Sequence, residues 1–285
     1  MTDNLPPLPR ILFEETVSRA LLEDLGRTGD ITSDAIISSE KRAEARIIAR
    51  AEGRIAGTDI ACYAFHRLDP DVQFETVCND GLDVKQGEVI AAIEGGARSI
   101  LTAERTALNF LSHLSGIATA TSCIVTAVSD YPARVVCTRK TTPGLRSLEK
   151  YAVRAGGGFN HRFGLDDAVL VKDNHIAVAG GISEAIQRVR RRMGHMVKVE
   201  VEVDTLDQLG TALKEDIDAI LLDNMSLEIL SEAVRIVDGK VITEASGGIT
   251  AETARSIAAT GVDLLSIGWL THSAPAMNLS LEIAT

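Results

Sequence analysis

The chain has 285 residues, of which 45% are hydrophobic and 24% are charged, and its formal net charge is -11. This composition is typical of a globular protein, and the length permits one large domain or two. The acidic balance argues against a nucleic-acid binder, because neutralising phosphates requires a broad basic surface. We also expect no membrane contact, since no apolar run approaches the ~20 residues of a spanning helix, and no signal peptide in the proline-rich segment 1–10.

The four cysteines, Cys62, Cys78, Cys123 and Cys137, show neither close pairing nor the spacing of metal ligands. We therefore expect free thiols and a reducing, cytoplasmic location.

The first hundred residues mix helix and strand signals without regular alternation. Segment 11–25 has helical spacing, and Gly26 is suited to cap its carboxyl end. Segment 43–50 alternates as a strand does, and 73–77 and 89–93 read as two further strands around a turn. The amino-terminal part is therefore predicted to be α+β in character.

The turn-rich segment 81–94 leaves one alternative open, because it resembles a lipoyl-type hammerhead. A carrier module of that kind needs a modifiable lysine at an exposed hairpin tip, and Lys85 is the available residue. A mass increase on Lys85 would support the carrier, and an unmodified mass would remove it.

Segment 101–130 is strongly helical, but it contains Ser115-Gly116. Because glycine disfavours a helix interior, we predict two helices with a break at this point. The break also marks the predicted domain boundary, with one domain over 1–116 and a second over 117–272.

From Arg134 onward, short apolar strands alternate with helical segments. Such alternation predicts a parallel sheet, either closed towards a β/α barrel or open and doubly wound. No Gly-x-Gly-x-x-Gly follows the first strand, which favours the barrel, incomplete because only six strands are evident. The predicted strands are 134–138, 168–172, 197–203, 219–223, 241–246 and 264–267.

Polar groups or glycines occupy the carboxyl ends of all these strands, where β/α barrels place their active sites. Cations gathered in an acidic protein indicate a small, highly anionic ligand. The residues at these ends are Arg139, Lys140, Lys172, Glu202, Asp223, Ser246, Gly247, Gly248 and Gly268.

Strand 197–203 alternates valines with Lys198, Glu200 and Glu202. The valine face suits packing against helices, so the charged face is predicted to point into the barrel, where charges need partners. Lys140 and Lys172 are the expected partners. The alternative is an exposed edge strand with one solvated face.

Several of these residues have a specific expected ligand. His161 stands beside Arg162, which is plausible in an anion site. The glycines after Ser246 lead into a helix and are suited to bind phosphate, as is Gly268. Glu202 and Asp223 could coordinate Mg²⁺ together with substrate oxygens, stabilise positive charge on a sugar ring, or pair with the lysines.

Taken together, these residues resemble the carboxylating nicotinate-nucleotide pyrophosphorylases, also called quinolinate phosphoribosyltransferases. The similar segments occur in order along nearly the whole chain. They are 23–26 (EDLG), 29–32 (GDIT), 104–109 (ERTALN), 115–119 (SGIAT), 138–144 (TRKTTPG), 160–162 (NHR), 172–175 (KDNH), 200–202 (EVE), 222–224 (LDN), 244–248 (EASGG) and 271–273 (THS).

The resemblance implies an α/β sandwich domain followed by an open β/α barrel, with residues 273–285 packing back on the sandwich. It implies transfer of phosphoribose from phosphoribosyl pyrophosphate to quinolinate with loss of CO₂, giving nicotinate mononucleotide for NAD biosynthesis. It further implies Mg²⁺ and a homodimer or dimer-based hexamer. A related group with the same fold, associated with molybdenum transport, is the alternative.

The resemblance also assigns roles. Arg105, reaching the neighbouring subunit's site, and Arg139, His161 and Arg162 would bind quinolinate. Lys140, Lys172, Glu202 and Asp223 would be catalytic, the lysines holding anionic charge and the acids facing the ribose, the metal and an oxocarbenium-like centre. The substrate-binding set also includes Thr138, Ser246, Gly247, Gly248, Ile267, Gly268 and Trp269. Trp269 departs from the family, which commonly has a small residue there, and Asn278 replaces a usual acid.

Overall fold

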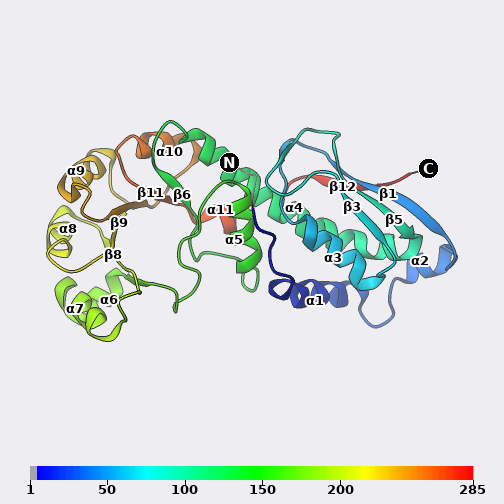
Figure 1. Ribbon diagram of the computed structural model, residues 1–285, viewed down its shortest axis with the longest axis horizontal. Helices are drawn as coiled ribbons and strands as arrows, with labels where there is room; N and C mark the ends of the chain where they lie inside the picture. Colours follow the sequence, from blue (N-terminus) through cyan, green and yellow to red (C-terminus); the bar gives the residue numbers. More distant parts are fainter. Residues whose placement is uncertain (1–4, 285) are drawn as a thin grey trace. The chain divides into compact units, whose positions relative to one another are not determined.

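The computed structural model describes residues 5–284, so the first four residues and Thr285 of the ranges above lie outside it. The chain divides into two compact units (Figure 1). Unit 1 comprises Met1–Ser122, Thr141–Gly157 and Leu270–Thr285, and unit 2 comprises Cys123–Lys140 and Gly158–Trp269. The limits of the two domains inferred from the sequence stay a prediction.

Unit 1 is built on a four-stranded antiparallel sheet with the order β12-β1-β5-β3. The strands confirm the predicted ones, and Gly26 caps the first long helix in a left-handed conformation. Its strands are β1 (Arg42–Ala49), β3 (Gln73–Thr76), β5 (Val89–Gly96) and β12 (Leu279–Ile283), and β2 (Gly53–Arg54) pairs with β4 (Asp83–Val84). Its helices are η1 (Arg10–Leu12), α1 (Glu14–Leu25), α2 (Ile31–Ile36), α3 (Thr58–Leu68), α4 (Ala97–Ala127) and α5 (Arg146–Ala155).

Helix α4 is continuous, so the predicted break at Ser115-Gly116 is wrong. Ser115 lies in the helix interior, where its hydroxyl accepts the backbone N–H of Ala56. Gly116 permits close approach of another segment, since a Cβ built on it would lie 2.2 Å from the Pro275 carbonyl oxygen. The glycine therefore serves the packing of the carboxyl-terminal segment against α4, and it does not end the helix.

Helix α4 also corrects the expectation about membrane spans. By length and composition it is apolar enough to cross a membrane, with a window of mean hydropathy 1.3. Its Ile100, Leu111, Leu114 and Ile117 side chains are fully buried within the protein. This burial is that of a core helix, and core helices pass the same test.

We expect Gly116→Ala to lower the free energy of unfolding by about 3 kcal/mol, because the added methyl group meets backbone that cannot shift cheaply. Urea unfolding monitored by circular dichroism measures the change. Gly210→Ala is the matched control, since this glycine lies in a helix with open space around it and the change should stabilise by about 0.5–1 kcal/mol. Equal stability of the two variants would contradict the packing argument.

Unit 2 contains a six-stranded sheet with the order β6-β11-β10-β9-β8-β7, and all of its pairings are parallel. Strands β6 and β7 form its edges, so the barrel is open and incomplete, as predicted. The sheet curves, with α7 to α10 along its outer face (Figure 1). Its strands are β6 (Arg134–Val136), β7 (Val169–Val171), β8 (Val199–Val203), β9 (Ala219–Asp223), β10 (Ile242–Ser246) and β11 (Leu264–Ser266). The helices are α6 (Asp173–Ala179), α7 (Ile182–Arg192), α8 (Leu206–Ala212), α9 (Leu227–Val237), α10 (Ala251–Ala258) and α11 (Trp269–His272), the last crossing into unit 1.

Candidate active site

The structure brings most of the predicted site residues to one edge of the unit 2 sheet. This edge is formed by the carboxyl ends of the parallel strands, and it is where β/α folds bind ligands. Thr138, Arg139 and Lys140 follow β6, Lys172 follows β7, Glu202 and Asp223 lie at the ends of β8 and β9, Ser246 to Gly248 end and follow β10, and Ile267, Gly268 and Trp269 follow β11.

A short ion pair joins the ends of β7 and β8. The Lys172 Nζ lies 2.5 Å from Glu202 Oε2, and the glutamate side chain is largely buried whereas the lysine is half exposed. The predicted pairing of Glu202 with Lys172 is therefore confirmed. Lys198 does not share the inner face as expected, because it lies just before β8, is exposed, and pairs with Asp218 at 2.6 Å.

Two arginines form the cationic part of the site. Burial, and then the neighbouring Arg139 charge, hold the pKa of Arg162 below its ordinary value. The Arg162 Nη1 donates to the Ala168 carbonyl oxygen over 2.9 Å, which fixes the direction of its side chain. Two guanidinium groups close enough to repel one another in a partly buried place are suited to an anion with more than one carboxylate or phosphate oxygen.

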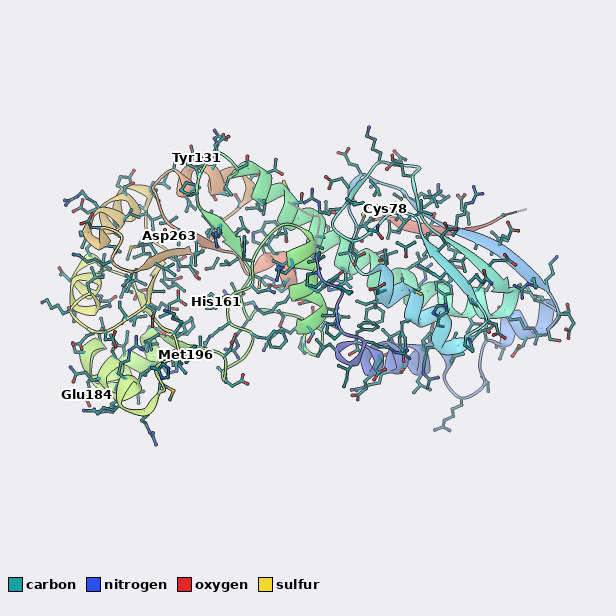
Figure 2. All side chains as sticks on the ribbon, viewed as in Figure 1. Cys78, Tyr131, His161, Glu184, Met196 and Asp263 are labelled. Atoms are coloured by element: carbon teal, nitrogen blue, oxygen red, sulfur yellow. The ribbon has the colours of Figure 1, made fainter. Side chains whose placement is uncertain are left out.

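His161, which is labelled in Figure 2, forms hydrogen bonds through both nitrogens of its ring. Its Nε2 lies 2.8 Å from Glu200 Oε2, and its Nδ1 accepts the backbone N–H of Arg162 over 2.7 Å. Both nitrogens are thus engaged within the chain, and His161 orders the segment that carries Arg162. The predicted direct contact of His161 with a ligand stays a prediction.

The sequence interpretation missed the importance of Glu244. This residue is buried in β10, and its Oε2 lies 3.6 Å from His161 Nε2. Glu200 was expected on the inner face, but its partner is His161 and neither of the predicted lysines. An acid in the middle of a central parallel strand was the available signal, because such a strand is normally covered on both faces.

The loop after β10 needs its glycines. Gly247 and Gly248 have φ of 100° and 59°, in the left-handed region that favours glycine, and a Cβ on Gly247 would meet Asn224 Oδ1 at 2.1 Å. Trp269 Nε1 donates to the Ile249 carbonyl oxygen over 2.8 Å. The tryptophan that departs from the family pattern therefore ties the residues after β11 to this loop.

Arg105 belongs to unit 1 and not to unit 2. It is exposed on α4 and lines a pocket of about 350 Å³ together with Glu23, Asp24, Asn109 and His113. The far side of His113 is fixed, since its Nε2 lies 2.9 Å from the fully buried carboxylate of Glu149. Arg105 thus lines a partly acidic pocket. Its sequence context alone would indicate only a solvent-exposed charge on a helix.

The open β/α barrel, with its paired guanidinium groups, strand-end carboxylates and glycine loop, defines an enzyme class that acts on small anionic molecules bearing phosphate. Comparisons with known proteins identify the family. The family model of the quinolinate phosphoribosyl transferase N-terminal domain matches residues 30–115 of the sequence, and the family model of the C-terminal domain matches residues 117–282. The chain belongs to the quinolinate phosphoribosyltransferase family.

Relatives match over nearly their whole length. The probable nicotinate-nucleotide pyrophosphorylase [carboxylating] of Bacillus subtilis is 44% identical over 95% of this chain and 93% of the relative. A quinolinate phosphoribosyltransferase [decarboxylating] of Nicotiana tabacum, named as mitochondrial, is 40% identical over 98% of this chain and 84% of its own. The solved structure of the nicotinate-nucleotide pyrophosphorylase from Francisella tularensis has a TM-score of 0.94 and 42% identity, and the match covers 100% of both chains.

Proposed function

We propose that this protein transfers the phosphoribosyl group of phosphoribosyl pyrophosphate to quinolinate, with loss of CO₂, and so forms nicotinate mononucleotide for NAD biosynthesis. Its membership of the quinolinate phosphoribosyltransferase family supports this reaction. The molybdenum-transport alternative is not favoured, since the relatives are named for the biosynthetic enzyme. The same relatives do not favour the carrier alternative. The backbone N–H of Lys85 donates to the Glu88 side chain, which closes a turn at this point.

The observation that carries the proposal is the Arg139–Arg162 pair. Quinolinate is a dicarboxylate, and a guanidinium fork matches a carboxylate with two parallel hydrogen bonds. The repulsion between the two arginines is relieved when a dianion binds between them. His161 would support this arrangement through Arg162, and Lys140 would add positive charge next to Arg139.

The carboxylates at the strand ends would assist the exchange of bonds at the ribose. The bond from ribose C1 to pyrophosphate breaks, a bond from C1 to the quinolinate nitrogen forms, and positive charge develops on the ring between these events. Glu202 and Asp223 would stabilise that charge, while Lys172 holds Glu202 in place and offers its positive charge to phosphate oxygens. Loss of CO₂ then leaves a ring carbon that takes up a proton. Catalysis is mainly positioning and electrostatics, without a covalent nucleophile.

The donor set also fits Mg²⁺. Asp223 accepts the Asn224 side-chain N–H over 2.6 Å, and Glu202 accepts a hydrogen bond from Lys172, so both carboxylates are oriented at adjoining strand ends. Mg²⁺ prefers one or two carboxylates together with substrate phosphate oxygens. Glu202 and Asp223 would hold the ion, which supplies neutralising charge to the departing pyrophosphate. Ser246 to Gly248 and the Gly268 loop, tied by Trp269, would bind the 5′-phosphate through backbone N–H groups.

We further propose a homodimer, or a hexamer built from three dimers, in which Arg105 completes the partner's site. The exposure of Arg105 on α4 and the formed pocket beside it support this role. The free cysteines support a reducing, cytoplasmic location. No nucleic acid or membrane is involved in the proposed activity.

Mixing two inactive variants tests whether Arg105 acts in the partner subunit's site. Arg105→Ala and Arg139→Ala are each expected to be inactive, but dimers reassorted from a mixture should regain about a quarter of the wild-type activity. The reason is that half of the dimers would be mixed, and each mixed dimer would have one site with both arginines intact. Activity that stays absent after verified subunit exchange would show that Arg105 acts within its own subunit or not at all.

The proposed reaction is tested by incubating the protein with quinolinate, phosphoribosyl pyrophosphate and Mg²⁺. Mass spectrometry should detect nicotinate mononucleotide, and none should form when either substrate is omitted. A well-folded protein that gives no product would contradict the proposal and return the paralogous group to consideration.

A further inference from the structure

Two glutamates and His161 form a buried cluster on the inner face of the unit 2 sheet. Glu244 is 1% exposed and Glu200 is 8% exposed. The His161 Nε2 lies 2.8 Å from Glu200 Oε2 and 3.6 Å from Glu244 Oε2. Within residues 5–284, this is the group of three side chains that could bind a metal, with one donor atom of each within 4.8 Å of the others.

The hydrogen bonds of His161 argue against a metal and define its protonation. The Arg162 backbone N–H donates to Nδ1 over 2.7 Å, and a nitrogen that accepts a hydrogen bond carries no proton. The ring proton is therefore on Nε2 and points to Glu200 Oε2. His161 is neutral in this arrangement, and its Nε2 has no lone pair for a metal ion.

A neutral His161 has one N–H to donate, so it cannot supply hydrogen bonds to every oxygen of the two carboxyl groups. The Oε1 atoms of Glu200 and Glu244 are both buried and have no hydrogen-bond partner within the described residues. Two ionised carboxylates, each with a buried Oε1 that lacks a donor, would be costly in this place. One proton held by the pair would remove a negative charge and supply an O–H donor. Glu244 is the more buried of the two, so the neutral form falls to it.

We propose that Glu244 is a positioning residue that holds a proton at neutral pH and donates a hydrogen bond with it to Glu200, which keeps His161 in its uncharged Nε2–H form. Burial first, and then the Glu200 charge, raise the pKa of Glu244 to about 7, while a hydrogen bond with Ser266 opposes the rise. The chain of contacts continues from His161 to the Arg162 backbone. Glu244 therefore sets the charge and orientation beneath the anion site.

A dependence on pH follows, and its substrate half rests on the proposed function. The groups that act on Glu244 are Glu200, His161 and Ser266, and Glu200 acts in turn on Arg162, beside which lie Arg139 and Asp167. When Glu244 loses its proton, a second negative charge appears beside Glu200, the glutamate that acts on Arg162, and this added charge opposes the binding of a dicarboxylate. The KM for quinolinate should rise about tenfold between about pH 6.5 and about pH 8.5, with a smaller change in kcat.

The first test needs no substrate. Infrared spectra of the ligand-free protein should show the carbonyl stretch of a buried protonated carboxyl near neutral pH, and this band should fade as the pH rises. Glu244→Gln should lose the band, and the exposed Glu252→Gln should keep it. A wild-type spectrum without such a band overturns the proposal, even where the glutamine variant does not fold.

The second test compares pH profiles. Glu244→Gln keeps the shape and a donor group without titrating, so its KM for quinolinate should stay flat where that of the wild type and of Glu252→Gln rises. Parallel profiles for all three proteins would overturn the proposal. A wild-type protein that shows the infrared band but forms no nicotinate mononucleotide would refute the proposed function and leave the protonation of Glu244 standing.

Discussion

Arg139→Ala should reduce kcat/KM for quinolinate at least about 1,000-fold, equivalent to ~4 kcal/mol of transition-state binding. The variant removes one fork of the guanidinium pair and leaves a substrate carboxylate without its charged partner, which is the costly form of a broken interaction. Steady-state kinetics with quinolinate as the varied substrate measure the loss. Arg139→Lys keeps the charge without the fork and should recover only part of it.

The exposed Arg235→Ala in the same unit is the matched control for Arg139, since it removes an arginine that pairs with Glu232 on the helix surface. Its activity should equal that of the wild type. An Arg139→Ala variant that is folded and retains more than about a tenth of the wild-type kcat/KM would contradict the dicarboxylate site.

Lys172→Met should lower kcat/KM for phosphoribosyl pyrophosphate by about 100-fold to 1,000-fold. The change removes a positive charge that would face phosphate oxygens, and it leaves the largely buried Glu202 carboxylate without the lysine that lies 2.5 Å away. Kinetics with phosphoribosyl pyrophosphate as the varied substrate measure this effect.

Lys198→Met offers a matched control, because Lys198 also forms a lysine–carboxylate pair, with Asp218 at 2.6 Å, at the opposite end of β8. This variant should keep the wild-type kinetics, since the amino ends of the strands lie away from the site. Similar losses for the two lysine variants would show that Lys172 acts through general stability and not through the substrate.

Much of the fold could be predicted because hydrophobic periodicity is local. The predicted ends of all six unit 2 strands lie within two residues of the observed ends. Short apolar runs that alternate with helical segments are compatible with few structures other than strands of a parallel sheet. The break at Ser115-Gly116 was wrong because the need for Gly116 comes from Pro275, about 160 residues along the chain, which local sequence does not show. Lys198 was wrongly placed on the inner face of the predicted strand 197–203, because β8 begins only at Val199 and Lys198 lies just before it.

The site was predictable only where chain topology alone brings residues together. Residues at the ends of parallel strands meet at one edge, so Lys172 and Glu202 could be paired from sequence. The Glu200–Glu244–His161 cluster joins two non-adjacent strands and a loop, and the role of Glu244 depends on which oxygen faces which nitrogen. The surroundings of Arg105 could not be predicted from its own sequence context, because the pocket beside it is formed by two helices far apart in sequence.

The most direct test of the central claim is the coupling of decarboxylation to phosphoribosyl transfer. Quinolinate labelled with carbon-13 in the carboxyl group at position 2 would be incubated with the protein and Mg²⁺, with and without phosphoribosyl pyrophosphate. The account predicts labelled CO₂ in equal amount to nicotinate mononucleotide, and none without the phosphoribosyl donor. Release of CO₂ without the donor, or product that retains the label, would contradict it.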